Sequence, residues 1–181
     1  MIRRRRGLFI AYLVCCSGVV RAQGDISEGT WSIVVGNDPT SYQSFLSLQQ
    51  EAMDTIKNES ATNNVIPVLE FRCTPGNAEM TPVIDWRRFI SSFNTEVGFR
   101  VDGGKMLWQK WGVDQSNKVT ASKSAADSQS IVEHLRGGRN LEVEVTPYSG
   151  SPVTVRFDLA GLSNSLAKLE KECQKTSDTF R

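Results

Sequence analysis

Five carboxylates are the first residues of this 181-residue chain whose type and spacing could do chemistry. A glycoside hydrolase can work with two acids alone, one to protonate the leaving oxygen and one to attack or to activate water. The candidates lie on stretches in which apolar and polar residues alternate: Glu70, Asp85, Asp102, Glu142 and Glu144. A secreted hydrolase of the cell wall, working through Glu70, Asp85 or Asp102, is therefore one candidate function.

Arginines close to these acids favour a structural role instead. Arg72, Arg100 and Arg156 occupy the same alternating polar positions as the acids. Opposite charges on neighbouring strands form cross-strand pairs on the surface of a sheet, each contributing about 0 to 1 kcal/mol. We favour this ladder of charge pairs over a catalytic pair of acids.

Other catalytic signatures are missing from the sequence. His134 is the only histidine, and a metal site needs several clustered ligands. The chain contains no HExxH, no G-x-S-x-G, no phosphate-binding P-loop and no Cys/His cluster. We therefore predict no catalytic residue, no metal and no cofactor.

Aromatic residues offer a different function, which is binding. Trp108 and Trp111 are three positions apart, so on a straight strand they face opposite sides. Either Trp111 packs in the core while a loop covers Trp108, which we favour, or one ring is exposed as an anchor for a partner. Tyr148 lies in a turn and is the third candidate for binding.

The N-terminus predicts export. Arginines at 3–6 precede an apolar run at 7–14 and a small-residue cleavage site at Ala22, the pattern of a signal peptide at residues 1–22. The arginine pair leaves the general secretory and twin-arginine routes both open. Cleavage removes five arginines and no acid, which leaves 16 basic and 20 acidic residues and a net charge of −4. This charge does not favour nucleic acid or an anionic membrane as a partner.

Two cysteines remain after cleavage, and they are the strongest structural signal. Cys73 ends an apolar run, and Cys173 follows Leu162, Leu166 and Leu169 at helical spacing. In an oxidising compartment such a pair is most simply one disulfide, here fastening a C-terminal helix to a sheet. Two free thiols, one of them a nucleophile, are the alternative.

Alternation of apolar and polar residues is the dominant signal along the rest of the chain. Period-two patterns cover 97–102, 141–146 and 153–158, and further strands are predicted at 31–35, 45–48, 65–73, 82–86, 107–111 and 118–121. The turn from Pro147 to Pro152 predicts a hairpin tip. It would place Arg156 and Asp158 near Glu142 and Glu144.

Helices are predicted at 127–136 and 162–173. Asp127 or Ser128 is the expected cap of the first helix, and Ser163 or Asn164 that of the second. The polar segment 52–64 reads as a long loop. These elements predict one mainly β domain at 23–173, an antiparallel β-sandwich or open barrel with two short helices, followed by a polar tail at 174–181.

Several of these segments together resemble a known family. The order of VLEFRC at 68–73, VIDW at 83–86, FRVD at 99–102, Trp111, VTPYSGSPVTVRFDLAGL at 145–162 and Cys173 is similar to the VasI/TagO family of type VI secretion-associated proteins. Gly112, where that pattern has a serine, and the tail after Cys173 depart from it.

The resemblance implies an exported accessory protein of a contractile secretion apparatus in a Gram-negative bacterium, without established catalytic activity. We accordingly expect a periplasmic adaptor that binds an envelope or secretion-system protein, with peptidoglycan as a further candidate partner. A peptidoglycan hydrolase is the first alternative. An inhibitor or immunity-like protein that plugs the cleft of a cell-wall enzyme with the Tyr148 hairpin tip is the second.

Overall fold

The computed structural model describes residues 31–38 and 42–175. The predicted signal peptide at 1–22 and the tail beyond Lys175 lie outside the described residues. Within the described ranges, no helix has the length and apolar character needed to cross a membrane.

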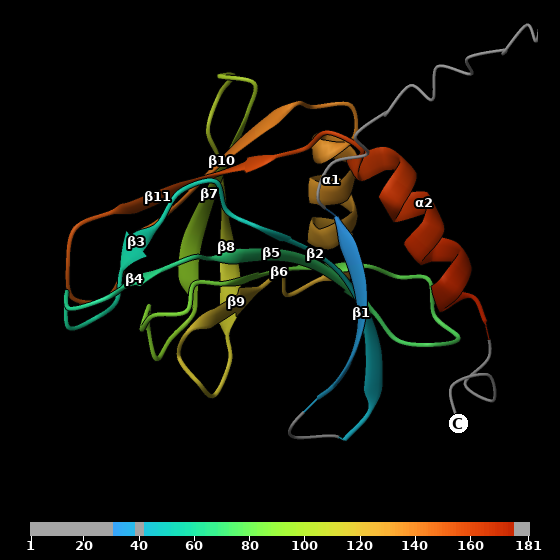
Figure 1. The fold of residues 1–181 in the computed structure, drawn as a ribbon, viewed down its shortest axis with the longest axis horizontal. Coiled ribbons are helices and arrows are strands. Elements are labelled where there is room, and N and C mark those ends of the chain that lie inside the picture. The colour runs from blue at the N-terminus through green and yellow to red at the C-terminus, as the bar shows by residue number, and fades with distance from the viewer. Residues whose placement is uncertain (1–30, 39–41, 176–181) are drawn as a thin grey trace, which may run out of the picture.

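Antiparallel strands are the main regular structure of the fold (Figure 1). Nine of them form one sheet in the order β1-β2-β5-β6-β9-β8-β7-β10-β11. The strands of this sheet are β1 (Ser32–Asn37), β2 (Ser44–Glu51), β5 (Val68–Cys73), β6 (Thr81–Asp85), β7 (Thr95–Val101), β8 (Leu107–Val113), β9 (Val119–Ala121), β10 (Asn140–Val145) and β11 (Val153–Asp158). The mainly β class predicted from alternation is confirmed.

Alternation explains how these strands pack. In β10, Leu141, Val143 and Val145 are buried, while Glu142 and Glu144 on the other face are partly exposed. The strand pairs with β7 on one side and β11 on the other, so the apolar side chains of all three share one face. The predicted hairpin between β10 and β11 is confirmed, with its tip at residues 146–152.

The sheet curls toward closure as an open barrel. The N–H of Met53, just after β2, donates to the carbonyl of Arg156 in β11 at 2.8 Å, so the two ends of the strand order approach each other. In the described part of the chain, β11 has no strand pairing with β1 or β2. One core cluster contains Leu48 and Phe71 from one half of the sheet and Phe99 and Phe157 from the other.

Helix α1 (Ala125–Leu135) buries Ile131, Val132 and Leu135, as predicted. The predicted caps, Asp127 and Ser128, are wrong. Ser124 caps the helix instead: its hydroxyl accepts the Asp127 N–H at 3.1 Å. The Ser124-x-x-Asp127 spacing is that of a capping box with an aspartate in the acidic place, which puts Asp127 inside the first turn.

Helix α2 (Leu162–Cys173) presents Leu162, Leu166, Leu169 and Cys173 to the core. Cys173 is bonded to Cys73 at the end of β5, with 6.2 Å between their Cα atoms. The predicted disulfide is thus present, and it fastens α2 to the sheet. The caps predicted for α2 at 163 and 164 are wrong, because Gly161 begins the helix with a left-handed backbone (φ 77°) and no side-chain cap.

The predicted loop at 52–64 also needs correction. It contains β3 (Ile56–Lys57), which pairs with β4 (Asn64–Val65) in a small second sheet. Because each strand has two residues, the alternation that predicts strands has no room to appear. In Figure 1 this hairpin lies beside β11, far from α2.

Candidate binding surface

Glu70 is a buried acid whose carboxylate is hydrogen-bonded to two neighbouring side chains. It is only 5% exposed. Its Oε2 accepts hydrogen bonds from Ser47 Oγ and Arg72 Nε, each at 2.8 Å. The predicted pairing with Arg72 is therefore present, but the predicted position on an exposed polar face is wrong, because Ser47 and Arg72 enclose the carboxylate.

Asp85 and Asp102 stabilise turns. The Asp85 carboxylate accepts the N–H of Arg87 at 2.8 Å. Asp102, at a positive φ of 48° after β7, accepts the N–H of Asn140 at 2.8 Å and that of Arg139 at 3.1 Å. Both carboxylates therefore satisfy backbone donors where a strand ends, the usual work of aspartate in turns.

Glu142 and Glu144 lie on β10, away from Glu70 and Asp85. Glu142 forms an ion pair with Arg100 of β7, as a cross-strand ladder requires. It also lies opposite Arg156, as predicted, but the ion pair of Arg156 is with Asp54. Glu144 lies opposite Gly98 and Thr154. In the strand order, β9 and β8 separate Glu70 and Asp85 from Asp102, Glu142 and Glu144. The sheet therefore does not gather the five acids into one site.

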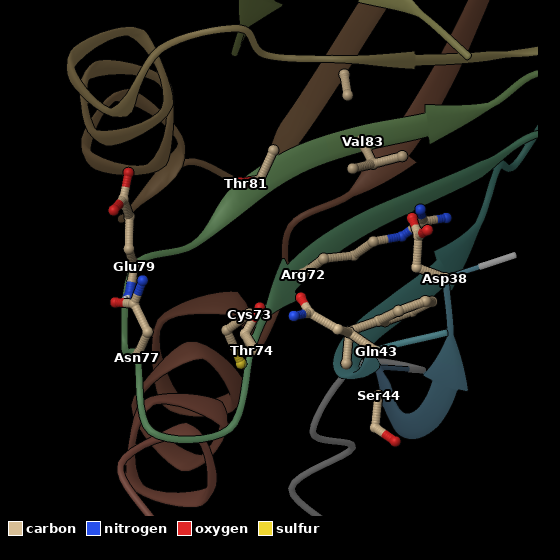
Figure 2. Close-up of a pocket in the computed structure, with 12 residues that line it drawn as sticks. Asp38, Gln43, Ser44, Arg72, Cys73, Thr74, Asn77, Glu79, Thr81 and Val83 are labelled. Atoms are coloured by element: carbon tan, nitrogen blue, oxygen red, sulfur yellow. Dashed lines mark hydrogen bonds between the residues drawn. The ribbon is translucent and has the colours of Figure 1, made fainter. Parts of the chain in front are cut away.

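The hollow in Figure 2 is the first of two candidate sites. It has a volume of about 420 Å³ and lies against the ends of β5 and β2 near the disulfide. Figure 2 shows Arg72 extending from β5 toward the segment that carries Asp38, with Asn77 and Glu79 on the opposite wall. The Arg72 guanidinium is already paired with Glu70 and lies 4.8 Å from the Phe45 ring centroid. The cation that lines this hollow is therefore engaged within the protein.

Metal ligation finds no support in the described ranges 31–38 and 42–175, which hold no group of three or more His, Cys, Asp or Glu side chains able to bind an ion. His134 is exposed in the last turn of α1. A histidine in the last turn of a helix is common in proteins without any metal, so its position has a structural explanation.

The second candidate site is aromatic, and Trp108 anchors it. β8 pairs with β7 in regular register, so Trp108 and Trp111 face opposite sides of the sheet. Trp111 is fully buried against Phe99, with 5.0 Å between ring centroids, and is therefore not a surface anchor. Trp108 is 48% exposed, so the loop that we expected to cover it does not do so.

Gly98 explains how the Trp108 ring lies. The two residues are paired across β7 and β8. A Cβ atom on Gly98 would lie 3.0 Å from Trp108 Cζ3 and 3.0 Å from Met106 Sδ. Because glycine has no Cβ, the indole packs over the β7 backbone and keeps its other side toward solvent.

Two further aromatic residues are exposed, in the segments that lead into β7 and out of β10. Tyr148 of the hairpin tip is 76% exposed and Phe93 of the segment before β7 is 68% exposed. Their ring centroids are 6.4 Å apart, within the range of a favourable aromatic pair. The Tyr148 N–H donates to the Ile90 carbonyl at 2.8 Å, so the backbone also joins their segments.

An open hollow lies beside Trp108 and beside residues that adjoin this pair in the sequence. It has a volume of about 420 Å³, and Asn94, Thr95, Glu96, Trp108 and Thr146 line it. Asn94 follows Phe93, and Thr146 lies two positions before Tyr148. We call Phe93, Trp108 and Tyr148 the aromatic surface. Its large apolar rings lie near the amide, hydroxyl and carboxylate groups that line the hollow. This combination suits the surface to binding.

Phe93 and Asp54 are two residues of these contacts that were not predicted from the sequence. Phe93 stands between Ser92 and Asn94, and an aromatic residue among turn-forming residues was a usable signal of exposure. Asp54 had no such signal. Its partner Arg156 lies 102 positions away, and only the curl of the sheet brings them together.

Comparison with known proteins finds similarity among solved structures. No protein-family model and no curated protein matches this chain. Among solved structures, the crystal structure of invasion associated protein B from Bartonella henselae is similar, with a TM-score of 0.45 and 19% sequence identity over 78% of this chain and 90% of that chain. Similarity at this level assigns no role to any side chain.

Proposed function

We propose that this chain is an exported, periplasmic accessory or adaptor protein of a type VI secretion system and that it acts by binding. The proposed pathway rests on the resemblance of the segments at 68–73 and 145–162 to the VasI/TagO family. The proposed compartment rests on the N-terminal signal pattern and on the Cys73–Cys173 disulfide, because disulfides persist in oxidising compartments such as the periplasm.

The aromatic surface is the observation that carries the binding role. Tryptophan and tyrosine are enriched among residues that dominate binding energies, because they supply large contact areas and lose little conformational entropy. Trp108 is fixed by the β7–β8 pairing and Tyr148 by its backbone bond to Ile90. Rings held in place before binding lose less freedom when a partner arrives.

Secretion in the organism that encodes the chain tests this role. The gene is deleted and replaced by the wild type, by the double variant Trp108→Ala/Tyr148→Ala, or by Tyr42→Ala as the matched control. Tyr42 is also an exposed aromatic residue, and it lies between β1 and β2, outside the aromatic surface. Loss of about 2 kcal/mol at a binding hot spot weakens a complex by about 30-fold.

We expect the wild type and Tyr42→Ala to restore release of the system's secreted components and the double variant to fail at equal abundance. Equal secretion by all three would show that the aromatic surface is not needed for secretion. Unaffected secretion after deletion would refute the proposed role in type VI secretion.

Incubation of the purified protein with isolated sacculi separates binding from hydrolysis. We expect no soluble muropeptides, because four of the five candidate acids already accept hydrogen bonds or form ion pairs within the protein: Glu70, Asp85, Asp102 and Glu142. Release of muropeptides that disappears in Glu70→Gln or Asp85→Asn would establish the hydrolase instead. Tight 1:1 inhibition of a lysozyme would favour the inhibitor.

A further inference from the structure

The two edges of the sheet are built differently, and the β11 edge is blocked. The Arg156 carbonyl accepts the N–H of Met53 at 2.8 Å, and the Arg156 N–H donates to Asp54 Oδ2 at 2.9 Å. The Arg156 guanidinium also binds Asp54, with Nη2 at 2.7 Å from Oδ1. Both backbone groups of this edge residue therefore have partners, so another strand cannot use them.

The β1 edge has no such protection. β1 pairs with β2 along one side, and within the described residues no strand pairs with its other side. Its sequence, Ser-Ile-Val-Val-Gly-Asn, contains no charge and no proline. Ile33, Val34 and Val35 are all exposed. Sheet proteins normally protect a free edge with lysine, proline, a bulge or a covering segment, and an unprotected apolar edge pairs with other chains.

Both ends of β1 are nevertheless fixed. At its start, the Trp31 indole N–H donates to the Ala160 carbonyl at 3.1 Å, and the Trp31 ring lies 5.9 Å from that of Phe71. At its end, the Asp38 N–H donates to the Gln43 carbonyl at 2.9 Å. β1 is therefore held in an extended conformation, which lowers the entropy lost when another strand pairs with it.

We propose that β1 is a dimerisation edge and that its occupant is β1 of a second copy of this chain, paired antiparallel about a twofold axis. A twofold axis perpendicular to the sheet keeps each residue on its own face, so opposed residues must differ by an even number of positions. Centring the pair on Val34 places Val34 opposite Val34, Ile33 opposite Val35, and Ser32 opposite Gly36.

This register matches every apolar residue of β1 with another apolar residue. Centring on Val35 instead would oppose Ile33 with Asn37 and Val34 with Gly36. β-Branched pairs across strands are stabilising and like charges are not, and an uncharged strand meets no repulsion from its own copy. The product is one continuous sheet formed from two nine-stranded sheets.

Cysteine cross-linking of the full chain tests both the edge and the register. The background carries Cys15→Ser and Cys16→Ser, and the native disulfide is buried and bonded. In the proposed register the two copies of Val34→Cys face each other with Cα atoms about 4.5 to 5.5 Å apart, which suits a disulfide. Val35→Cys is the matched control, because its opposite residue is Ile33.

We expect mild oxidation to give a covalent dimer for Val34→Cys and little for Val35→Cys. Random collision would give the reverse order, because Val35 is 63% exposed and Val34 37%. Dominant cross-linking of Val35→Cys, or none in either variant, overturns the proposed register.

Sedimentation over a concentration series provides an independent test of the dimer. We expect the wild type to show a monomer–dimer equilibrium, and Val34→Lys to raise its dissociation constant by about tenfold or more, because two lysines would oppose each other. Thr154→Lys, an exposed site on the blocked β11 edge, is the control and should leave the constant unchanged. A wild-type chain that stays monomeric throughout overturns the proposal.

Discussion

Asp54 shows what a single side chain contributes to this fold. Its carboxylate receives the Arg156 backbone N–H and two guanidinium nitrogens. The hydrogen bond from the Arg156 side chain, above all, lowers the pKa of Asp54 below its usual value. The same contact raises the pKa of Arg156 above its usual range. One carboxylate therefore joins the two ends of the strand order.

A pH-dependent loss of stability follows from this contact. Because the pKa of Asp54 is lower in the folded than in the unfolded state, its contribution is complete above about pH 4 and disappears as the pH falls through the folded value. We expect Asp54→Asn to lower the free energy of unfolding by at most about 1 kcal/mol at pH 7, because the pair is near the surface.

Urea unfolding at several pH values checks this prediction. The difference between wild type and Asp54→Asn should shrink as the pH falls below about 4. Glu144→Gln, an acid of the same sheet without a basic residue directly opposite, is the control. A difference between wild type and Asp54→Asn that is equally large at every pH would contradict the role given to the charge.

Among the elements, α2 depends on a distant part of the chain. Its thiol is bonded to Cys73 across 100 positions, and the Gly76 N–H donates to the Cys173 carbonyl at 2.7 Å. Arg136 of the α1 C-cap adds an ion pair to Glu170 at 2.6 Å. These contacts fasten the helix to the end of β5 and to α1.

Removing the disulfide should destabilise the whole protein. Closing so long a loop restricts the unfolded chain, and loss of such a bridge costs about 2 to 5 kcal/mol. We expect Cys73→Ser/Cys173→Ser to unfold at a lower urea concentration, with a midpoint shift that corresponds to this loss of unfolding free energy. Reductant should shift the wild type in the same direction and leave the double variant unchanged. A wild-type midpoint insensitive to full reduction would refute a stabilising role for the bridge.

Local sequence patterns predicted which segments form strands and helices. Contacts between distant segments determined features that no local pattern contains. Alternation predicted β7, β10 and β11, and the leucine spacing of 162–173 predicted α2, because burial on one face leaves a periodic trace in the sequence. The caps were missed because each helix begins before the polar residues predicted to cap it, α1 after Ser124 and α2 after Gly161. Which of Trp108 and Trp111 is buried depends on the β7–β8 register, which no local pattern contains.

At the scale of the whole molecule, one core joins both halves of the curled sheet and both helices. Trp86, from the segment after β6, and Trp111, from β8, are fully buried in it. Trp86 also donates its indole N–H to Thr120 Oγ1 of β9 at 3.0 Å. No part of this core can open without exposing residues that the rest depends on.

A single cooperative transition is therefore expected. Near-ultraviolet circular dichroism reports the packing of the buried tryptophans, and far-ultraviolet circular dichroism reports the strands. With the disulfide intact, both signals should give the same urea midpoint and the same dependence of unfolding free energy on urea. Separate midpoints would show that the two halves of the sheet unfold independently.

The backbone bond between Tyr148 and Ile90 has a consequence for partner exchange. It joins the hairpin tip to the strand-free segment that carries Phe93, so we expect the two rings to move together and not as separate loops. Under the proposed binding role, a ligand would then leave both rings almost simultaneously. Partners of the proposed surface should therefore differ mainly in residence time, and much less in how fast they arrive.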